Sequence, residues 1–245
     1  TTFQGADHYK SGGVQFAARS ADAALASFDE EKLETYEVGI KSRLLNDRLQ
    51  LNGAIFQYTY EDQQVQSIVL VSANTVVLTE NAGDSTVKGL EVEAVARLSE
   101  NLDVGFNYTY LDAVFDEFMS ATGSQAGNRL AFAPEHAFNI DATYRHSLGT
   151  VGDIALSGNY SWKDDHFFDF ENNPGAFQES YGLVNLAAWW DLPDGHTRLR
   201  VFCDNCGDQT YLTNVVIFPE GPPGGGGRKS FGLLQRYGIE LSYQF

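Results

Sequence analysis

The sequence lacks an apolar run that could form a membrane-spanning helix. Such a helix needs about 20 consecutive apolar residues, whereas the mean hydropathy of this chain is −0.26. Methionine occurs once, while phenylalanine, tyrosine and glycine occur 17, 12 and 24 times in 245 residues. This composition favours many strands over helices. Any membrane role would therefore be played by β-strands, in which outward apolar residues alternate with inward polar ones.

Positive charge is also scarce. The chain holds 16 Lys and Arg against 33 Asp and Glu, which gives a net charge of −17. Proteins that bind nucleic acid need cationic groups opposite the phosphates, so we expect no nucleic-acid partner. The chain opens on Thr1-Thr2-Phe3-Gln4, without the basic and apolar regions of a signal peptide. We expect either a processed form or a chain that begins inside a longer polypeptide.

Signatures of catalysis and metal binding are missing as well. Neither G-x-S-x-G nor H-E-x-x-H occurs. Five histidines are scattered without the spacing of metal ligands: His8, His136, His146, His166 and His196. Glu91 and Glu93 lie on one strand face about 7 Å apart, a separation compatible with glycosidase chemistry, but the charged face of a two-faced strand explains them better. We predict no enzyme, no cofactor and no metal site.

The last nine residues alternate strictly between apolar and polar or small side chains. The apolar set lies on one face of a strand and consists of Tyr237, Ile239, Leu241, Tyr243 and Phe245. Chain termini usually fray, so an apolar stripe that runs to the last residue is informative. It fits the closing strand of a soluble sandwich, or the final, lipid-facing strand of an outer-membrane barrel, where it would act as the insertion signal.

Similar alternation predicts at least nine strands. We expect them at Thr35–Leu45, Arg48–Tyr60, Thr86–Leu98, Leu102–Tyr110, Phe138–Tyr144, Ile154–Trp162, Val184–Leu192, Thr197–Cys203 and Tyr237–Phe245, with a tenth near His8–Arg19. The connections alternate between short turns and long loops. The long loops are roughly 61–85, 112–135 and 163–180, and one more precedes the final strand. A transmembrane barrel has short periplasmic turns and long external loops, whereas a soluble meander has no reason for this alternation.

Aromatic residues gather where the predicted strands end. The outer ends of the ascending strands carry Tyr58, Tyr60, Tyr108, Tyr110, Tyr160 and Trp162, and the periplasmic ends of descending strands carry Trp190, Tyr243 and Phe245. Aromatic girdles occupy both interfaces of a membrane barrel. The opposite strand faces are polar or charged: Glu37, Lys41, Arg43, Glu91, Glu93, Asp103, Asn107, Asp141, Arg198 and Arg200. Because Arg or Lys costs about 2–4 kcal/mol against lipid at the midplane, these faces must line a wet lumen, in a wide or plugged barrel.

Several short motifs follow one another in the order of a known family. They are Tyr9–Gly13, Leu33–Ser42, Leu49–Phe56 with Tyr60–Gln64, Asn81–Gly83 with Val87–Glu93, Ala133–His136, Asp204–Tyr211, and Arg236–Gly238 with the terminal Phe245. Together they resemble the C-terminal barrel portion of a TonB-dependent outer-membrane receptor, over nearly the whole chain. Two positions depart from the family pattern: Lys32-Leu33 stands where a proline precedes the glutamate, and Cys206 stands where leucine follows asparagine.

The resemblance implies an all-β, transmembrane, antiparallel up-and-down barrel. Family barrels have 22 strands, so residues 1–245 would supply the C-terminal nine or ten, and the N-terminal plug, the TonB box and the first half of the barrel would lie outside this chain. It also implies active uptake of a scarce nutrient across the outer membrane of a Gram-negative bacterium, most commonly an iron–siderophore complex. The implied partners are outer-membrane lipids, the barrel-assembly machinery, a TonB-type energy transducer reached through the missing N-terminal part, and the nutrient complex. The alternatives are a self-contained ten-stranded channel or adhesin, and a soluble all-β binding protein.

Two places in the external loops are candidate sites. His166, Phe167, Phe168 and Phe170 form an aromatic group in the loop 163–180 that could contact a substrate, pack on a neighbouring loop or bind a partner. The same histidine and its acidic neighbours Asp164, Asp165, Asp169 and Glu171 could supply nitrogen and oxygen ligands to a divalent cation, or form a solvated acidic loop. Cys203 and Cys206 follow a strand at a loop mouth, where a structural disulfide is expected in an oxidising compartment. Free thiols and a redox role are the alternatives.

Overall fold

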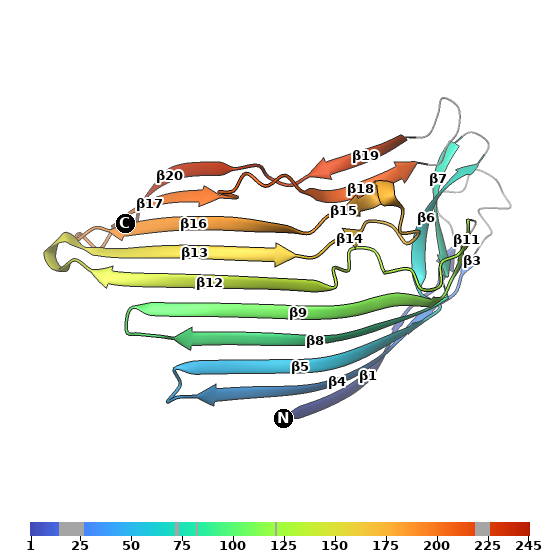
Figure 1. Ribbon diagram of the computed structural model, residues 1–245, viewed down its shortest axis with the longest axis horizontal. Coiled ribbons are helices and arrows are strands. Elements are labelled where there is room, and N and C mark those ends of the chain that lie inside the picture. Colours follow the sequence, from blue (N-terminus) through green and yellow to red (C-terminus); the bar gives the residue numbers. More distant parts are fainter. Residues whose placement is uncertain (15–26, 72–73, 82, 121, 219–225) are drawn as a thin grey trace.

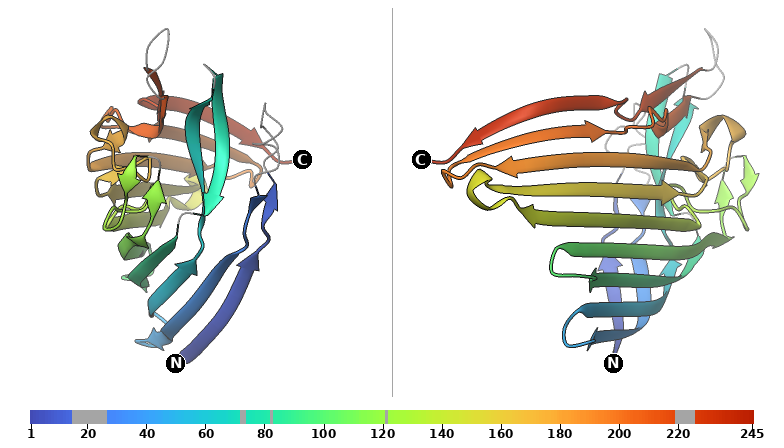
Figure 2. Two further views of the ribbon diagram at one scale, coloured as in Figure 1. Left: turned by 90° about the vertical axis from the view of Figure 1, so that its right-hand side faces the viewer. Right: turned by 60° about the vertical axis from the view of Figure 1, so that its left-hand side comes forward.

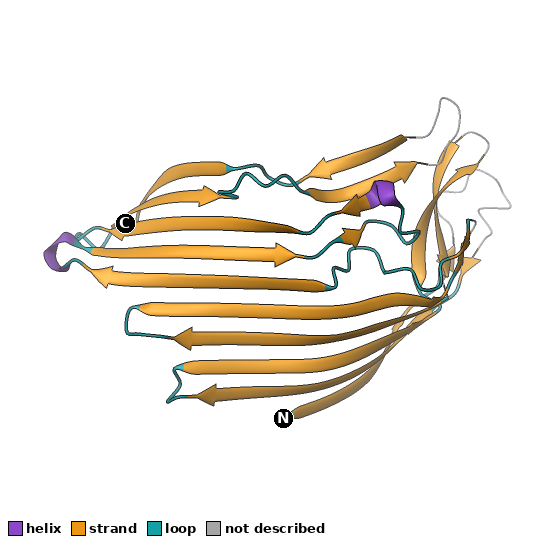
Figure 3. Cartoon of the chain, viewed as in Figure 1, coloured by secondary structure: helices purple, strands orange, loops and turns teal. Residues whose placement is uncertain are grey.

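The computed structural model describes residues 1–14, 27–71, 74–81, 83–120, 122–218 and 226–245. Its main element is one ten-stranded antiparallel sheet that curves into an open arc (Figures 1 and 2). Two short 3-10 helices, η1 (Gly149–Val151) and η2 (Pro174–Ala176), interrupt an otherwise β structure (Figure 3). Within the described ranges, no helix is long and apolar enough to cross a membrane.

The strands of the sheet follow one another in chain order, each paired with its neighbours. They are β1 (Thr2–Lys10), β4 (Glu31–Leu44), β5 (Leu49–Glu61), β8 (Asp84–Arg97), β9 (Leu102–Glu117), β12 (His136–Ser147), β13 (Asp153–Lys163), β16 (Tyr181–Asp191), β17 (Thr197–Asp204) and β20 (Arg236–Tyr243). This up-and-down order and the strand number confirm the prediction. Among the described strands, β1 pairs only with β4 and β20 only with β17, so the sheet is open at both edges.

Short turns join the strands at one end of the sheet and long connections join them at the other (Figure 1). The long connections carry small hairpins of their own: β2 (Gly13–Val14) with β3 (Ser27–Phe28), β6 (Gln64–Val71) with β7 (Asn74–Asn81), β10 (Met119–Ser120) with β11 (Gly123–Ser124), β14 (His166–Phe167) with β15 (Phe177–Gln178), and β18 (Leu212–Phe218) with β19 (Gly226–Phe231). The predicted alternation of connection lengths is therefore confirmed. We call the end with the long connections the mouth.

The apolar stripes of successive strands lie on one face of the sheet and are exposed. Cross-strand pairs such as Leu241–Leu199 and Leu156–Ala188 place apolar side chains side by side. Leu156, Ile239 and Leu241 are 50%, 75% and 71% exposed, so these stripes do not converge in a dry centre. A broad exposed apolar band on strands is the outer surface of a membrane barrel. Lys88 shares this face near the outer end of β8, where a long side chain can reach the interface.

Charged residues occupy the opposite, concave face, as the sequence predicts, and pair with one another. Asp103 accepts hydrogen bonds from Arg97 (3.3 Å) and Arg145 (2.6 Å). Further ion pairs join Arg198 to Asp191, Arg200 to Glu240 (3.3 Å), and Arg236 to Asp204 (2.6 Å). Solvent-exposed pairs of this kind contribute only about 0–1 kcal/mol each. These ion pairs nevertheless show that charge lies on the face that would line a wet lumen.

Two of the predicted girdle residues lie on the wrong face. Tyr58 and Tyr60 share the face of Asn52 and Phe56 on β5, whereas Ile55 on the other face is 61% exposed. The ring of Phe56 stacks on Tyr58 at 4.7 Å and covers Gly89, where a Cβ atom would come within 2.4 Å of it. These aromatic rings therefore fill the concave face next to a glycine. The other predicted girdle residues of the strands, Tyr108, Tyr110, Tyr160, Trp162, Trp190 and Tyr243, do lie on the apolar face.

Several predicted boundaries also need correction. Strand β4 begins at Glu31 rather than Thr35, and β9 continues to Glu117, past the predicted loop start at Asp112. The first strand is Thr2–Lys10 rather than His8–Arg19, and residues 15–19 of the predicted strand lie outside the described residues. Strand β20 ends at Tyr243, so Phe245 lies beyond the strand, with its ring 5.2 Å from that of Tyr243. The predicted loop 61–85 contains the β6–β7 hairpin.

Candidate functional site

The candidate site is the mouth, where three successive long connections pack together. Phe168, predicted as a substrate contact, is 6% exposed and packs with Ala176 and Val215. Its ring lies 5.3 Å from Phe132 of the preceding connection in an edge-to-face arrangement, a favourable geometry for aromatic pairs. One buried phenylalanine thus joins the connections β9–β12, β13–β16 and β17–β20.

A second aromatic cluster lies beside the first. Phe115 and Phe118 are buried, and Phe170 packs against this cluster, with its ring 5.1 Å from that of Phe118. Asn172 fastens the same two connections: its side-chain amide donates to the carbonyl of Arg129 (2.8 Å), and its Oδ1 accepts from the Arg129 backbone N–H (2.8 Å). These three connections therefore form one packed layer at the mouth.

The other predicted site residues take different places in this layer. His166 is 7% exposed, with its ring 5.1 Å from that of Phe168. Phe167 is half-buried, under the guanidinium of Arg129 at 5.1 Å, and Arg129 also pairs with Asp165 at 3.1 Å. Phe167 and Phe170 keep exposed surface, whereas Phe168 and His166 do not. Substrate contact stays a prediction, and Phe167 and Phe170 are the members of the group that can make it.

The acidic residues of the same loop do not gather around a cation position. In the part of the chain that the structure describes, no three His, Cys, Asp or Glu side chains could hold a metal ion together. Asp165 is paired with Arg129, and Glu171 accepts a hydrogen bond from the hydroxyl of Thr122 at 2.6 Å. Asp169 accepts from the backbone N–H of Asn173 at 3.0 Å, and its burial raises the pKa of its carboxyl above the ordinary value. Through this ion pair and these hydrogen bonds, the carboxylates stabilise the loop rather than form a cation site.

Acidification is expected to loosen the 164–180 loop through His166. Burial lowers the pKa of this imidazole, so the folded loop disfavours the protonated form that the open loop adopts below about pH 6.5. Loop stability should therefore fall as the pH drops through that value, and backbone amide exchange should be faster at about pH 5.5 than at about pH 7.5 after correction for intrinsic rates. The raised pKa of Asp169 has the opposite effect, because it stabilises the folded loop as the pH falls. A His166→Gln variant should lose the acid-induced opening, and an unchanged pH response in that variant would contradict the assignment.

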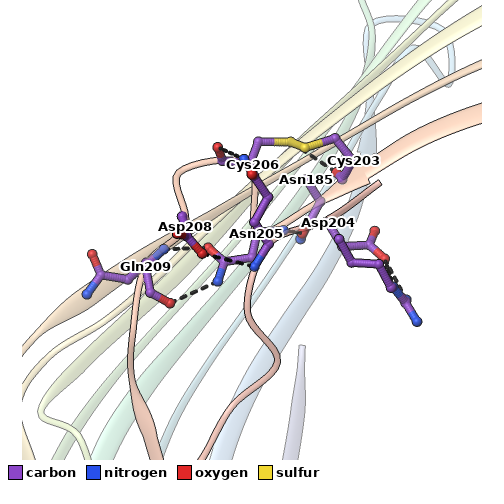
Figure 4. Close-up of a disulfide and its surroundings, with 9 residues drawn as sticks. Asn185, Cys203, Asp204, Asn205, Cys206, Asp208 and Gln209 are labelled. Atoms are coloured by element: carbon purple, nitrogen blue, oxygen red, sulfur yellow. Dashed lines mark hydrogen bonds and ion pairs between the residues drawn. A yellow bond between two sulfur atoms is a disulfide. The ribbon is translucent and has the colours of Figure 1, made fainter. Parts of the chain in front are cut away.

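Cys203 and Cys206 form a disulfide, with their Cα atoms 5.5 Å apart, at the end of β17 (Figure 4). Between them lies Asn205, which is 5% exposed and has a positive φ of 48°. Asparagine tolerates this backbone conformation better than most residues. The turn that leads from the sheet to the last outer hairpin is therefore closed covalently around a buried asparagine.

The concave face below the mouth holds two hollows. One, of about 360 Å³, is lined among others by Glu37, Lys41, Glu91 and Glu93. The other, of about 650 Å³, lies near the short turns and is lined among others by Arg145, Asp191 and Arg198. Both belong to the charged face, so they offer hydrogen-bonding and ionic contacts to whatever fills the lumen.

Comparison with known proteins identifies the family. The family described as "TonB dependent receptor-like, beta-barrel" matches residues 3–206. The chain belongs to the TonB-dependent receptor family. It matches the barrel part, and the fold and the recognition made from the sequence are confirmed.

Relatives agree with this assignment. The chain is 32% identical over 115 residues to the "Probable TonB-dependent receptor BfrD" of Bordetella pertussis, covering 47% of this chain and 14% of the relative. It is 22% identical over 206 residues to the ferripyoverdine receptor of Pseudomonas aeruginosa, covering 80% and 24%. The crystal structure of the ferric yersiniabactin uptake receptor FyuA from Yersinia pestis superimposes with a TM-score of 0.79 at 21% identity, covering 99% of this chain and 34% of FyuA. The chain therefore spans about a third or less of the length of these TonB-dependent receptors.

Proposed function

We propose that this chain is the C-terminal part of the barrel of an outer-membrane TonB-dependent transporter that takes up a scarce nutrient, an iron–siderophore complex. The family supports the transporter class, and the relatives named above include receptors for ferripyoverdine and ferric yersiniabactin. The single observation that carries the membrane assignment is the two-faced sheet, apolar and exposed outside and charged inside. The proposed partners are outer-membrane lipids, the barrel-assembly machinery, a TonB-type energy transducer and the ferric siderophore.

The open edges of the sheet favour this proposal over a self-contained ten-stranded channel or adhesin. A closed barrel of ten strands needs β1 paired with β20, and among the described strands each has a single partner, β4 and β17. Unpaired edges do not face lipid, because backbone groups there would lack hydrogen bonds. We infer that further strands complete the barrel, up to the 22 of the family, and that the plug and the TonB box lie outside this chain.

Loss of the gene is expected to abolish energy-dependent uptake of one class of ferric siderophore. The test uses iron-starved cells with and without the gene and follows uptake of ⁵⁵Fe bound to a tris-catecholate, a tris-hydroxamate or a carboxylate siderophore. Uptake of the cognate complex should fall to background, return on complementation, and stop when the proton-motive force is dissipated. Unchanged uptake of all three classes would reject iron–siderophore transport, and uptake that persists without the proton-motive force would reject TonB coupling.

A further inference from the structure

The turn after β17 is tied to both ends of the segment that carries the β18–β19 hairpin. The side-chain amide of Asn205 donates to the carbonyls of Gln209 (2.8 Å) and Leu233 (3.1 Å), and its Oδ1 accepts from the backbone N–H of Gln209 (2.9 Å). Gln209 precedes β18 and Leu233 follows β19. Both donors and the acceptor oxygen of this amide are thus used, and one buried side chain fastens both ends of the hairpin segment. Figure 4 shows the contact between Asn205 and Gln209.

The same turn is anchored to the wall of the sheet. The backbone N–H of Asn205 donates to Oδ1 of Asn185 at 2.8 Å, and the N–H of Cys206 donates to the carbonyl of Val184 at 2.8 Å. Asn185 in turn donates to Asn159 (3.3 Å), which donates to Asn139 (2.6 Å). A continuous row of side-chain amides therefore runs from the turn across β16, β13 and β12 on the concave face. We call the disulfide-closed turn 203–206 the Asn205 knot.

The hairpin held by the knot carries rare positive charge. The described residues of the outer segments 10–32, 61–84, 112–135, 163–181 and 204–236 include 18 Asp and Glu but seven Lys and Arg. Four of the seven are paired with carboxylates: Lys10, Lys32, Arg129 and Arg236. The other three make no ion pair with a described residue and are exposed, as cations that meet a ligand must be: Lys163, Arg228 and Lys229. Two of these three lie next to each other on β19.

We propose that Asn205 is a positioning residue for cargo recognition. The knot fixes the β18–β19 hairpin and thereby places Arg228 and Lys229 at the mouth on opposite faces of β19, where the one that faces the lumen binds an acidic group of the cargo, such as a catecholate or carboxylate oxygen. This inference rests on the proposed uptake function. It adds a chemical class of cargo contact and a residue that sets its geometry without touching the cargo.

The test compares variants of the full-length protein in isolated outer membranes. Asn205→Gly keeps the positive φ but removes the three side-chain hydrogen bonds, and Cys203→Ser/Cys206→Ser opens the covalent closure. The matched control is Asn46→Gly, because Asn46 also has a positive φ, 56°, but lies in an exposed short turn at the far end of the sheet. The first readout is amide exchange of residues 212–218 and 226–231, which needs no cargo. The second is the Kd for each ferric siderophore class, with Arg228→Gln/Lys229→Gln as the direct-contact variant.

Asn205→Gly should speed exchange in the hairpin by about tenfold or more, the effect of losing one to two net hydrogen bonds. It should weaken binding of the cognate siderophore by a similar factor. Arg228→Gln/Lys229→Gln should weaken binding with normal exchange, and Asn46→Gly should change neither readout.

Unchanged exchange in both knot variants would overturn the positioning role. Faster exchange with unaltered Kd in all variants would overturn the cargo contact. If the unmutated protein binds none of the siderophores, the proposed function fails and the cargo contact fails with it, while the exchange measurement still decides whether Asn205 fixes the hairpin.

Discussion

A Leu186→Arg substitution is expected to deplete the folded protein in the outer membrane severely. Leu186 lies in the middle of β16, on the apolar face, between Gly158 of β13 and Cys203 of β17, and is 51% exposed. An arginine facing lipid near the bilayer midplane costs about 2–4 kcal/mol, which corresponds to a roughly 30- to 700-fold shift in the folding equilibrium. The fraction of chains that resist urea extraction and show heat-modifiable mobility should fall accordingly.

The matched control for this prediction is the next residue. Ala187 lies on the concave face, opposite Ser157 and Phe202, so Ala187→Arg introduces the same charge one position away, on the other side of the sheet. It should assemble close to normally, because a wet lumen hydrates the guanidinium. If both variants are lost equally, contact with lipid is not the reason that arginine prevents assembly. If both variants assemble normally, the lipid-facing assignment is rejected.

Strand faces were predictable because alternation has a period of two that solvent enforces on every strand. Ile239 and Leu241 were placed correctly on the exposed apolar face from this period alone. Tyr58 was misplaced because the preference of tyrosine for interfaces was given more weight than its register: Phe56, Tyr58 and Tyr60 share one face of β5, whereas Gln57 and Thr59 follow Ile55 on the other. The missing signal was long-range: Phe56 lies directly opposite Gly89, and a large ring on the concave face fills the space that the glycine leaves.

The mouth was less predictable, because its residues depend on contacts between distant connections. Nothing local marks Asn205 as buried: its partners include Leu233, 28 residues further along the chain. Arg129 and Asn172 are joined across 43 residues. The aromatic loop 163–180 was recognised as unusual for a solvated segment, but composition could not separate a substrate contact from packing on a neighbouring loop. The burial of Phe168 against Val215 depends on a hairpin that follows it by more than 40 residues.

Phe168→Ala should therefore open the outer layer without unfolding the sheet. Truncating a buried phenylalanine typically costs about 3–5 kcal/mol, and here the cost falls on the packed connections because Phe168 contacts Ala176, Val215 and Phe132 rather than the strands of the wall. Amide exchange in residues 164–180 and 212–218 should rise by about 100- to 4,000-fold, while urea resistance and heat-modifiable mobility of the barrel stay normal. Phe231→Ala is the control, since Phe231 of β19 is 60% exposed and its truncation should leave exchange nearly unchanged.

The same variant separates packing from direct recognition. If Phe168 acts by packing, siderophore affinity and loop exchange change together, because the contact surface is lost when the layer opens. If Phe168 instead touches the cargo, affinity falls while exchange in the cargo-free protein stays at the unmutated rate. Phe167→Ala gives the reverse expectation: its half-buried ring under Arg129 can be removed with little opening, so a loss of affinity there would assign the contact to Phe167. A layer held by Phe168 and a surface presented by Phe167 is the arrangement that the burial of the two rings supports.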